Sequence, residues 1–317
     1  MTLFLSEADV GRLATMEMAL QAVEEAFRLQ GEAKADNAPR RRSRLQHGLL
    51  HVMSGSLPEL GLAGLKSYTT VSGQARFHVL LYDASDGKLV AVIEADRLGQ
   101  LRTGAASGVA TRHMARPEAS RLGIFGTGWQ ARSQVEAICA VRPIRTVLAY
   151  SRNPERRQSF SAELTEKLGI GVYPASNPEE AARDVDVVVT ATTAKQPVLE
   201  GAWLSPGTHV NAIGSNAAAK QEIDVESVRR AACIIVDSIE QAQLESGDLL
   251  PAVEAGACYW EDIRELGAVC SGHFPGREDA SEITLFKSHG VAIEDVAFGG
   301  RIYQAALAAG AGRELAL

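Results

Sequence analysis

A short glycine-containing turn, LGIFGTGWQA at residues 122–131, joins an apolar run to a helix-forming run. Gly126 permits a tight turn out of a strand, Gly128 lets backbone N–H groups approach a ligand, and Ala131 is small where helix meets strand. A helix that starts here directs free N–H groups and the positive end of its dipole toward the turn. Such a turn suits the pyrophosphate of a dinucleotide. The candidate cofactor contacts are Gly126, Thr127, Gly128, Trp129, Gln130 and Ala131.

The end of the next strand, YSRN at residues 150–153, contains a cation where dinucleotide-binding domains often have an acid. An Asp or Glu there would accept from both ribose hydroxyls and repel a 2′-phosphate. Ser151 can donate to a phosphate, Arg152 can bind one with two charge-assisted hydrogen bonds, and Arg156 adds charge one helical turn later. These residues favour NADP(H), with NAD(H) as the second choice. The alternative is that Arg152 is a solvated surface arginine.

Strand-like and helix-like runs alternate from Pro117 onward, which predicts a parallel sheet with helices on both faces. The predicted strands are RLGIFG, TVLAYS, GVYPA, DVVVTAT, THVNAIGS and ACIIVDS. The predicted helices are WQARSQVEAICAV, PERRQSFSAELTEKL and NPEEAARDV, the last capped by Asn177. This part of the chain therefore has the pattern of a Rossmann-type, doubly wound sheet.

The residues before Pro117 have a different pattern of polar and apolar residues, typical of a helix, an antiparallel sheet and a second helix. The elements are a periodic helix at 7–33, a basic stretch KADNAPRRRSRLQHG, apolar runs at 49–55 and 62–70, a hairpin turn DASDG, and a small-residue helix at 96–115. The C-terminal run GVAIEDVAFGGRIYQAALAAGAG is a helix that packs back on this first domain. We therefore expect an α/β protein with a Rossmann-type domain at 117–292 inserted between 1–116 and 293–317.

The composition limits the classes of partner. The chain has 317 residues, of which 46% are hydrophobic and 22% charged, and its formal net charge is −7. A negative chain disfavours nucleic acid and anionic membranes as partners, and no run suggests a signal peptide or a membrane span. The four cysteines have no metal-ligand spacing and are typical of buried thiols in a reducing compartment, so we expect a cytoplasmic protein without a metal site.

The chain resembles the ornithine cyclodeaminase/μ-crystallin family in five blocks. They are RTGAASGVAT, GIFGTGWQA, PGTHVNAIGSN, ESGDLL and ITLFKSHGVAIEDVA, in an order and spacing that cover nearly the full length. The resemblance implies a homodimer whose N-terminal region supplies the substrate pocket and the dimer contact. It also implies hydride transfer at the α-carbon of an amino or imino acid, as in ketimine and Δ1-pyrroline-2-carboxylate reductases, alanine dehydrogenases and cyclodeaminases.

Position by position, the resemblance implies that Arg40, Lys66 and Arg102 bind the substrate carboxylate. The chemistry is sound, because a carboxylate pairs well with a bidentate guanidinium and a point charge. Buried cations without an anion would also be costly. Which arginine of the run at 40–42 points inward stays open, and a solvated basic loop is the alternative. Lys66 is also the best-placed proton donor to an imine nitrogen, and we expect a lowered pKa for it.

On the cofactor side, the resemblance places two groups of residues near the dinucleotide. Thr192 and Thr193 match positions near the adenosine or ribose. The positions that match the nicotinamide side are Ile213, Gly214, Ser215, Lys287, Ser288 and Gly290. Helix caps and turn residues are the alternative interpretation for any one of them.

Two departures from the family pattern concern the reaction. Cyclodeaminase members have an aspartate at the position of Asn216 and an acidic residue at the position of His51, and these carboxylates assist loss of ammonia and ring closure. Asn216 cannot act as a base, and His51 does not attract an ammonium group, although it can donate a proton near neutral pH. Both departures argue against ornithine cyclodeamination. A strand that turns His51 to its other face is the alternative.

The leading hypothesis is an NADPH-dependent reductase of an imino acid that carries an α-carboxylate. Its substrate would be Δ1-pyrroline-2-carboxylate, Δ1-piperideine-2-carboxylate, or an imine formed from a 2-oxo acid and an amine. The alternatives are an alanine dehydrogenase, an ornithine cyclodeaminase that binds NAD+ tightly with no net redox change, and a binding protein without catalysis. Because Arg40, Lys66 and Arg102 are all present, the last alternative is the weakest.

Overall fold

The computed structural model describes residues 2–316, which form two compact units. The first unit comprises Met1–Ala105 and Gly290–Leu317, and the second comprises Ala106–His289. The chain passes from the first unit to the second inside a single helix, α3 (Asp96–Met114). The division between the compact units thus falls within the helix, whereas the change of sequence pattern at Pro117 follows its end. The continuous small-residue pattern of α3 conceals the point where one unit ends.

The first unit contains a seven-stranded sheet in the order β15-β1-β6-β5-β4-β3-β2. Its strands are β1 (Thr2–Leu5), β2 (Asp36–Leu45), β3 (Gly48–Leu57), β4 (Leu62–Val71), β5 (Gln74–Asp83), β6 (Leu89–Glu94) and β15 (Arg313–Leu315). The meander from β2 to β6 is antiparallel, but β1 pairs parallel with β6. The antiparallel sheet expected from the sequence is present in this meander, and β1, which was not expected, adds a parallel strand because helices separate it from the hairpins.

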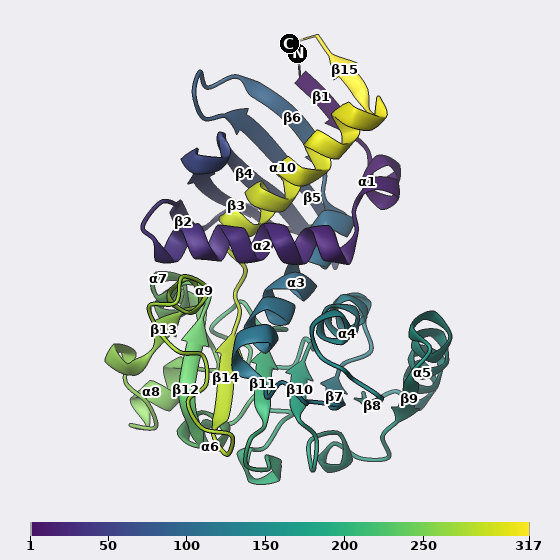
Figure 1. The fold of residues 1–317 in the computed structure, drawn as a ribbon, viewed down its shortest axis with the longest axis vertical. Helices are drawn as coiled ribbons and strands as arrows, with labels where there is room; N and C mark the ends of the chain where they lie inside the picture. The colour runs from purple at the N-terminus through teal and green to yellow at the C-terminus, as the bar shows by residue number, and fades with distance from the viewer. Residues whose placement is uncertain (1, 317) are drawn as a thin grey trace. The chain divides into compact units, whose positions relative to one another are not determined.

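Helices α1 (Glu7–Leu13), α2 (Met16–Gly31) and α10 (Ala292–Ala309) belong to the first unit, where α10 packs on α2 and on the central strands (Figure 1). The single helix expected at 7–33 is interrupted, because Ser6 and Thr15 each cap a separate helix. The C-terminal helix packs on the first unit as expected. Within the described residues, no helix is both long and apolar enough to cross a bilayer.

The second unit contains an eight-stranded sheet in the order β13-β12-β14-β11-β10-β7-β8-β9, in which every neighbouring pair is parallel. Its strands are β7 (Arg121–Phe125), β8 (Thr146–Tyr150), β9 (Gly171–Pro174), β10 (Val187–Thr190), β11 (His209–Ala212), β12 (Ala231–Val236), β13 (Arg264–Glu265) and β14 (Ile283–Lys287). The predicted doubly wound sheet is confirmed. The strand order reverses at β7, and ligands bind at such switch points in open α/β sheets.

The second unit contains six further helices, and all of them except α9 contribute side chains to two separate hydrophobic clusters. They are α4 (Trp129–Val141), α5 (Pro154–Leu168), α6 (Val225–Arg229), α7 (Ile239–Glu245), α8 (Leu250–Glu254) and α9 (Leu266–Cys270). The helix predicted for NPEEAARDV is only a 3-10 turn at Glu179–Ala181. Asn177 nevertheless accepts a hydrogen bond at the start of this turn, from the backbone N–H of Glu180 at 3.0 Å.

Candidate functional site

Lys66 and Arg102 of the first unit contact two carboxylates in the first turn of α10. The Nζ atom of Lys66 lies 2.8 Å from Oδ1 of Asp295, and Nε of Arg102 lies 3.2 Å from the same oxygen. Nη1 of Arg102 also lies 2.7 Å from Oε2 of Glu294. Strand β4, helix α3 and helix α10 thus bring together groups that are far apart in the sequence.

Arg40 on β2 lies at the beginning of the same helix. Its side chain is 6% exposed, and Nη2 donates to the backbone carbonyl of Gly290 at 3.1 Å. Arg41 and Arg42 are exposed, so Arg40 is the inward-facing arginine of this run. The β2–β3 register is irregular at this point, between Ala38 and Arg41. We call the following five residues the charged cluster: Arg40, Lys66, Arg102, Glu294 and Asp295.

Close packing around the charged cluster explains two glycines. A Cβ atom at Gly290, whose φ is +78°, would lie 2.7 Å from Nη1 of Arg102. A Cβ atom at Gly99 would lie 3.1 Å from Nζ of Lys66. The sheet fixes the lysine itself, because Lys66 pairs with Met53 on β3 and points to the buried face of β4.

The charges of the cluster do not cancel. Three of its side chains are cationic and two are carboxylates, which leaves one formal positive charge. Burial and, next in size, the nearby charge of Arg102 lower the pKa of Lys66, while Asp295 and Glu294 raise it; together these effects place it at about 8. Buried charges require counter-charges. The cluster therefore suits one additional anion, and a carboxylate matches its guanidinium and ammonium donors.

His51 lies on the same face of the sheet as Lys66. Its strand neighbour Tyr68 belongs to the alternation that buries Lys66, and the His51 and Tyr68 rings stack with centroids 4.2 Å apart. Nε2 of His51 is 3.1 Å from Oγ1 of Thr70. The strand does not turn His51 to the other face, so the alternative raised for it does not apply.

In the second unit, the glycine turn follows β7 directly and leads into α4. Gly126 has φ +102°, and a Cβ atom there would lie 2.3 Å from the carbonyl oxygen of Ala191, so only glycine fits. A Cβ atom at Gly128 would meet nothing within 4 Å, which leaves the N-terminus of α4 open to a ligand. Ala131 is fully buried in the hydrophobic core, whereas Trp129 is 56% exposed. Thr127 and Gln130 complete the turn.

The residues after β8 present hydroxyl and guanidinium groups. Oγ1 of Thr127 donates to Oγ of Ser151 at 3.0 Å, which ties the glycine turn to the end of the next strand. Arg152 and Arg156 are exposed. Asn153 caps α5 by accepting from the backbone N–H of Arg156 at 2.8 Å.

A buried carboxylate, Glu222, connects the segments that follow β10 and β11. Its side chain accepts from the backbone N–H groups of Thr192 and Gly214, each at 2.6 Å, and from Oγ1 of Thr192 at 2.7 Å. Oγ1 of Thr190 donates to it as well, at 3.1 Å. Burial raises the pKa of Glu222. Because parallel strands end at one edge of the sheet, Glu222 fixes two loops beside the glycine turn.

Lys287 at the end of β14 has internal partners. Its Nζ atom lies 2.9 Å from Oδ2 of Asp248 and donates to the carbonyl of Ser215 at 2.7 Å. The next residue, Ser288, donates to Oδ2 of Asp237 at 3.0 Å. Lys287 is completely buried, so it supports the loop that contains Ser215 and does not present its ammonium group at the surface.

The remaining candidates lie at the same edge of the sheet or in the first unit. Thr193 is exposed, and Ile213 and Asn216 are partly buried in the segment after β11. Gly290 belongs to the first unit, where its carbonyl accepts from Arg40 and its Cα lies close to Arg102; its place beside the nicotinamide stays a prediction.

Five buried carboxylates, from both units, were not selected as site residues in the sequence analysis. They are Glu222, Asp237, Asp248, Glu294 and Asp295. Asp248 lies in the block ESGDLL and the last two lie in ITLFKSHGVAIEDVA, so the blocks themselves carried a signal for three of them. Glu222 had none, because its partners are separated from it in the sequence by up to 32 residues.

Residues 1–310 match the ornithine cyclodeaminase/mu-crystallin family. The chain belongs to this family. A Δ1-pyrroline-2-carboxylate reductase of Bacillus cereus is 40% identical over 238 residues, which cover 75% of this chain and 73% of that protein. The resemblance seen in the sequence is thereby confirmed.

Two solved structures share the whole architecture. Thermococcus litoralis Δ1-pyrroline-2-carboxylate reductase in complex with NADH and L-proline is 35% identical, with a TM-score of 0.95 over 99% of this chain and 100% of that one. An archaeal alanine dehydrogenase dimer with bound NAD is 36% identical, with a TM-score of 0.94 over 99% of each chain.

We predict that Glu222→Gln weakens binding of the dinucleotide and lowers the free energy of unfolding by about 2–4 kcal/mol. The two carboxylate oxygens accept separately from the N–H groups of Thr192 and Gly214. In glutamine an NH2 group, which cannot accept, replaces one of these oxygens, so one N–H group is left buried without its acceptor and its loop loosens. Urea unfolding and fluorescence titration with NADH and NADPH measure the two effects. Glu226→Gln is the matched control, because Glu226 forms only an exposed pair with Arg229. Equal behaviour of the two variants would contradict the role of Glu222.

Proposed function

We propose that this chain is a nicotinamide-dependent reductase that delivers hydride to the α-carbon of an imino acid with a carboxylate group. The charged cluster carries this proposal, because its five side chains leave one positive charge that a substrate carboxylate would balance. The Thermococcus litoralis relative supports it, since that structure contains L-proline, an amino acid with an α-carboxylate, together with NADH.

The residues of the second unit fit a dinucleotide. The glycine turn leads into the N-terminus of α4, and the missing side chain of Gly128 leaves room for phosphate oxygens to reach backbone N–H groups. When bound, the reduced nicotinamide supplies hydride to the carbon of the substrate C=N bond.

The charged cluster would hold the substrate and provide the proton. Arg40 and Arg102 bind the carboxylate through their guanidinium groups. Lys66, with its pKa of about 8, is mostly protonated at neutral pH and can give an Nζ proton to the imine nitrogen. One hydride and one proton convert the C=N bond into CH–NH. His51 lies on the same sheet face and can assist through a water molecule.

The same site would run in reverse as an amino-acid dehydrogenase, and the archaeal alanine dehydrogenase makes this the second candidate function. Cyclodeamination is disfavoured by Asn216 and His51, which replace the two acidic residues of the cyclodeaminase members. Preferred substrates of the reductase are Δ1-pyrroline-2-carboxylate, Δ1-piperideine-2-carboxylate and imines of 2-oxo acids.

The decisive assay follows absorbance of reduced nicotinamide. We expect net loss of NADPH or NADH with Δ1-pyrroline-2-carboxylate, or with pyruvate and ammonia. Ammonia and proline formed from ornithine and NAD+, without net change in the cofactor, would instead identify a cyclodeaminase.

Arg40→Ala should raise the KM for the imino acid at least ~30-fold, equivalent to about 2 kcal/mol or more, because the substrate carboxylate loses a buried charged partner.

Arg41→Ala is the matched control for Arg40→Ala. Arg41 is the next residue in the sequence, but its side chain is exposed. The KM of the Arg41→Ala variant should therefore stay within about twofold of the wild-type value. Equal values of KM for the two variants would remove Arg40 from the substrate site.

We further propose a preference for NADP(H). Ser151, Arg152 and Arg156 follow β8 without a carboxylate among them, and both arginines are exposed where a 2′-phosphate would lie. The two solved structures described above contain NADH and NAD, so this proposal rests on the residues of this chain alone.

Arg152→Asp should lower the NADPH/NADH ratio of kcat/KM by about tenfold or more, because a charge-assisted hydrogen bond is replaced by repulsion. Steady-state kinetics with both cofactors measure the ratio. Arg145→Asp makes the same charge change at the opposite end of β8, where Arg145 is exposed, and should leave the ratio unchanged. An unchanged ratio in both variants would remove Arg152 from the phosphate site.

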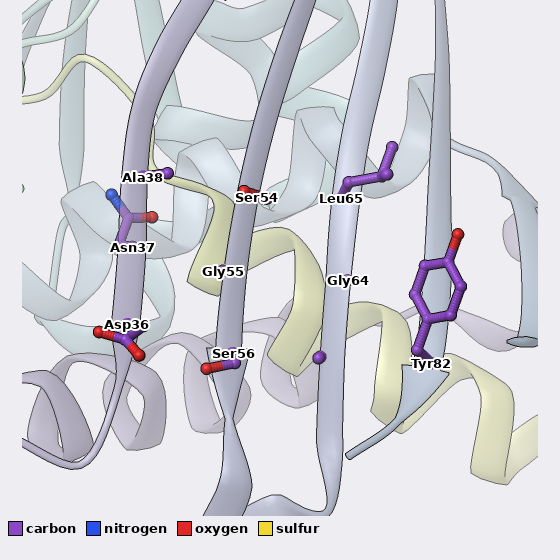
Figure 2. A pocket seen from close by; sticks show the side chains of 10 residues that line it. Asp36, Asn37, Ala38, Ser54, Gly55, Ser56, Gly64, Leu65 and Tyr82 are labelled. Carbon is purple, nitrogen blue, oxygen red and sulfur yellow. The ribbon is translucent and has the colours of Figure 1, made fainter. Parts of the chain in front are cut away.

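The sheet face opposite α10 favours a homodimer. Leu65, Leu80 and Val92 are neighbours in register across β4, β5 and β6, and all three are only partly buried. A hollow of about 580 Å³ lies over β2 to β5 beside Leu65 and Tyr82 (Figure 2). A second copy of the chain would cover these apolar side chains, and one related structure is a dimer.

Light scattering should give twice the 33.8 kDa mass of the chain. Leu80→Arg should convert the dimer to monomers, because a charge would be buried without a partner. Leu307→Arg changes an exposed leucine of α10 instead and should leave the dimer intact. A monomeric wild-type protein, or a dimeric Leu80→Arg variant, would contradict this interface.

A further inference from the structure

We infer that Asp295 is a positioning residue of the reductase, which ties the proton-donating lysine to a carboxylate-binding arginine and keeps the lysine charged. This inference rests on the proposed function. It concerns a residue outside the group expected to contact substrate, namely Arg40, Lys66 and Arg102. Asp295 would act through Lys66 and Arg102.

A single oxygen of Asp295 bridges both cations. Oδ1 lies 2.8 Å from Nζ of Lys66 and 3.2 Å from Nε of Arg102. These atoms come from β4, α3 and α10, so the bridge fixes the distance between two groups on different elements. Lys66 is 2% exposed and Arg102 is 7% exposed, which leaves little water to replace the carboxylate.

The second carboxylate oxygen of Asp295 does not stabilise the helix or a loop through a hydrogen bond. Oδ2 is buried and accepts no hydrogen bond from the described residues. Glu294, its neighbour in sequence, differs, because it pairs with Nη1 of Arg102 and also accepts from the backbone N–H of Val291 at 3.4 Å. Asp295 thus serves Lys66 and Arg102, while Glu294 serves Arg102 and the start of the helix. This difference makes Glu294 the matched comparison.

Asp295 lies at the start of a helix and beside two cations. It lies in the first turn of α10, where the helix dipole stabilises a negative charge. An ionised carboxylate next to Lys66 in turn stabilises the ammonium ion, which burial would otherwise deprotonate. Without this carboxylate, Lys66 would face the positive charge of Arg102 with the weaker effect of Glu294 to oppose it.

The groups around Lys66 determine the direction of the pH effect. Arg102 faces Lys66 from α3, Asp295 and Glu294 face it from α10, and the ring of Phe77 on β5 lies 5.2 Å from Nζ. Burial and Arg102 lower the pKa of Lys66, Asp295 raises it more than Glu294 does, and the balance places it at about 8. Reduction requires protonated Lys66, so its rate falls as pH rises through this pKa. Loss of the Asp295 charge must move that fall to lower pH.

The test compares Asp295→Asn with Glu294→Gln in the full-length protein. In Asp295→Asn, the rate of imine reduction should fall at a pH about one unit lower than in the wild type. The displacement in Glu294→Gln should be clearly smaller, although its KM should rise through Arg102. Asp295→Glu should restore most of the wild-type profile. Coincident limbs in wild type and Asp295→Asn would overturn the inference.

A second readout does not depend on activity. In protein labelled with ¹³C at the lysine Cε, the Lys66 signal is identified by its absence in Lys66→Met, and its titration gives the lysine pKa directly. Asp295→Asn should lower this pKa and Glu294→Gln should lower it less. If the wild type reduces no imine, the proposed function fails, and the titration alone decides the role of Asp295. Should Asp295→Asn not fold, Asp295→Ser removes the same charge, and a Lys66 titration equal to wild type would again overturn the inference.

Discussion

The ion pair between Lys66 and Asp295 is the contact on which the first unit depends. Both side chains are almost completely buried, and such a pair is costly unless the partners meet with good geometry. Side chains alternate between the two faces of β4, which places Lys66 on the buried face, and Asp295 lies in the first turn of α10. A Cβ atom at Gly290 would lie too close to Arg102, and one at Gly99 would make a tight contact with Lys66. A network held this tightly has little freedom to rearrange, which suits a site that must present fixed charges to a small anion.

The second unit uses buried carboxylates for a related purpose. Glu222 and Asp248 hold the loops after β10 and β11, and Asp248 also neutralises the buried Lys287. In both units, therefore, acidic residues organise the site, whereas the residues we selected from the sequence are mostly cations, glycines and hydroxyls. The acidic residues satisfy backbone N–H groups and cations that would otherwise be buried without partners.

The sequence predicted the parts of the fold that depend on local pattern. The glycine turn, the hairpin at DASDG and six strands of the second unit follow from periodicity and turn residues, and the structure contains them. Strand β14 was not predicted, because its buried run ends in Lys287, whose partner Asp248 is distant in the sequence. Asp295 was missed for the same reason, since 229 residues separate it from Lys66. Tertiary charge pairing is invisible to a local pattern. The resemblance to a family selected Lys66 and Arg102, but it named only the residues that would contact ligands.

The charge balance of the cluster also bears on the choice of substrate. One surplus positive charge accepts one carboxylate, and the α-imino acids proposed here have one. Ornithine would bring a second ammonium group to the far end of its side chain, and that group needs an acidic partner. On the face that carries Lys66, the next inward residue of β3 beyond Met53 is His51, stacked on Tyr68 and close to Thr70. An imidazole in this setting offers an ammonium ion much less than a carboxylate would. These contacts support the proposed choice of imino acids whose far end is neutral over ornithine.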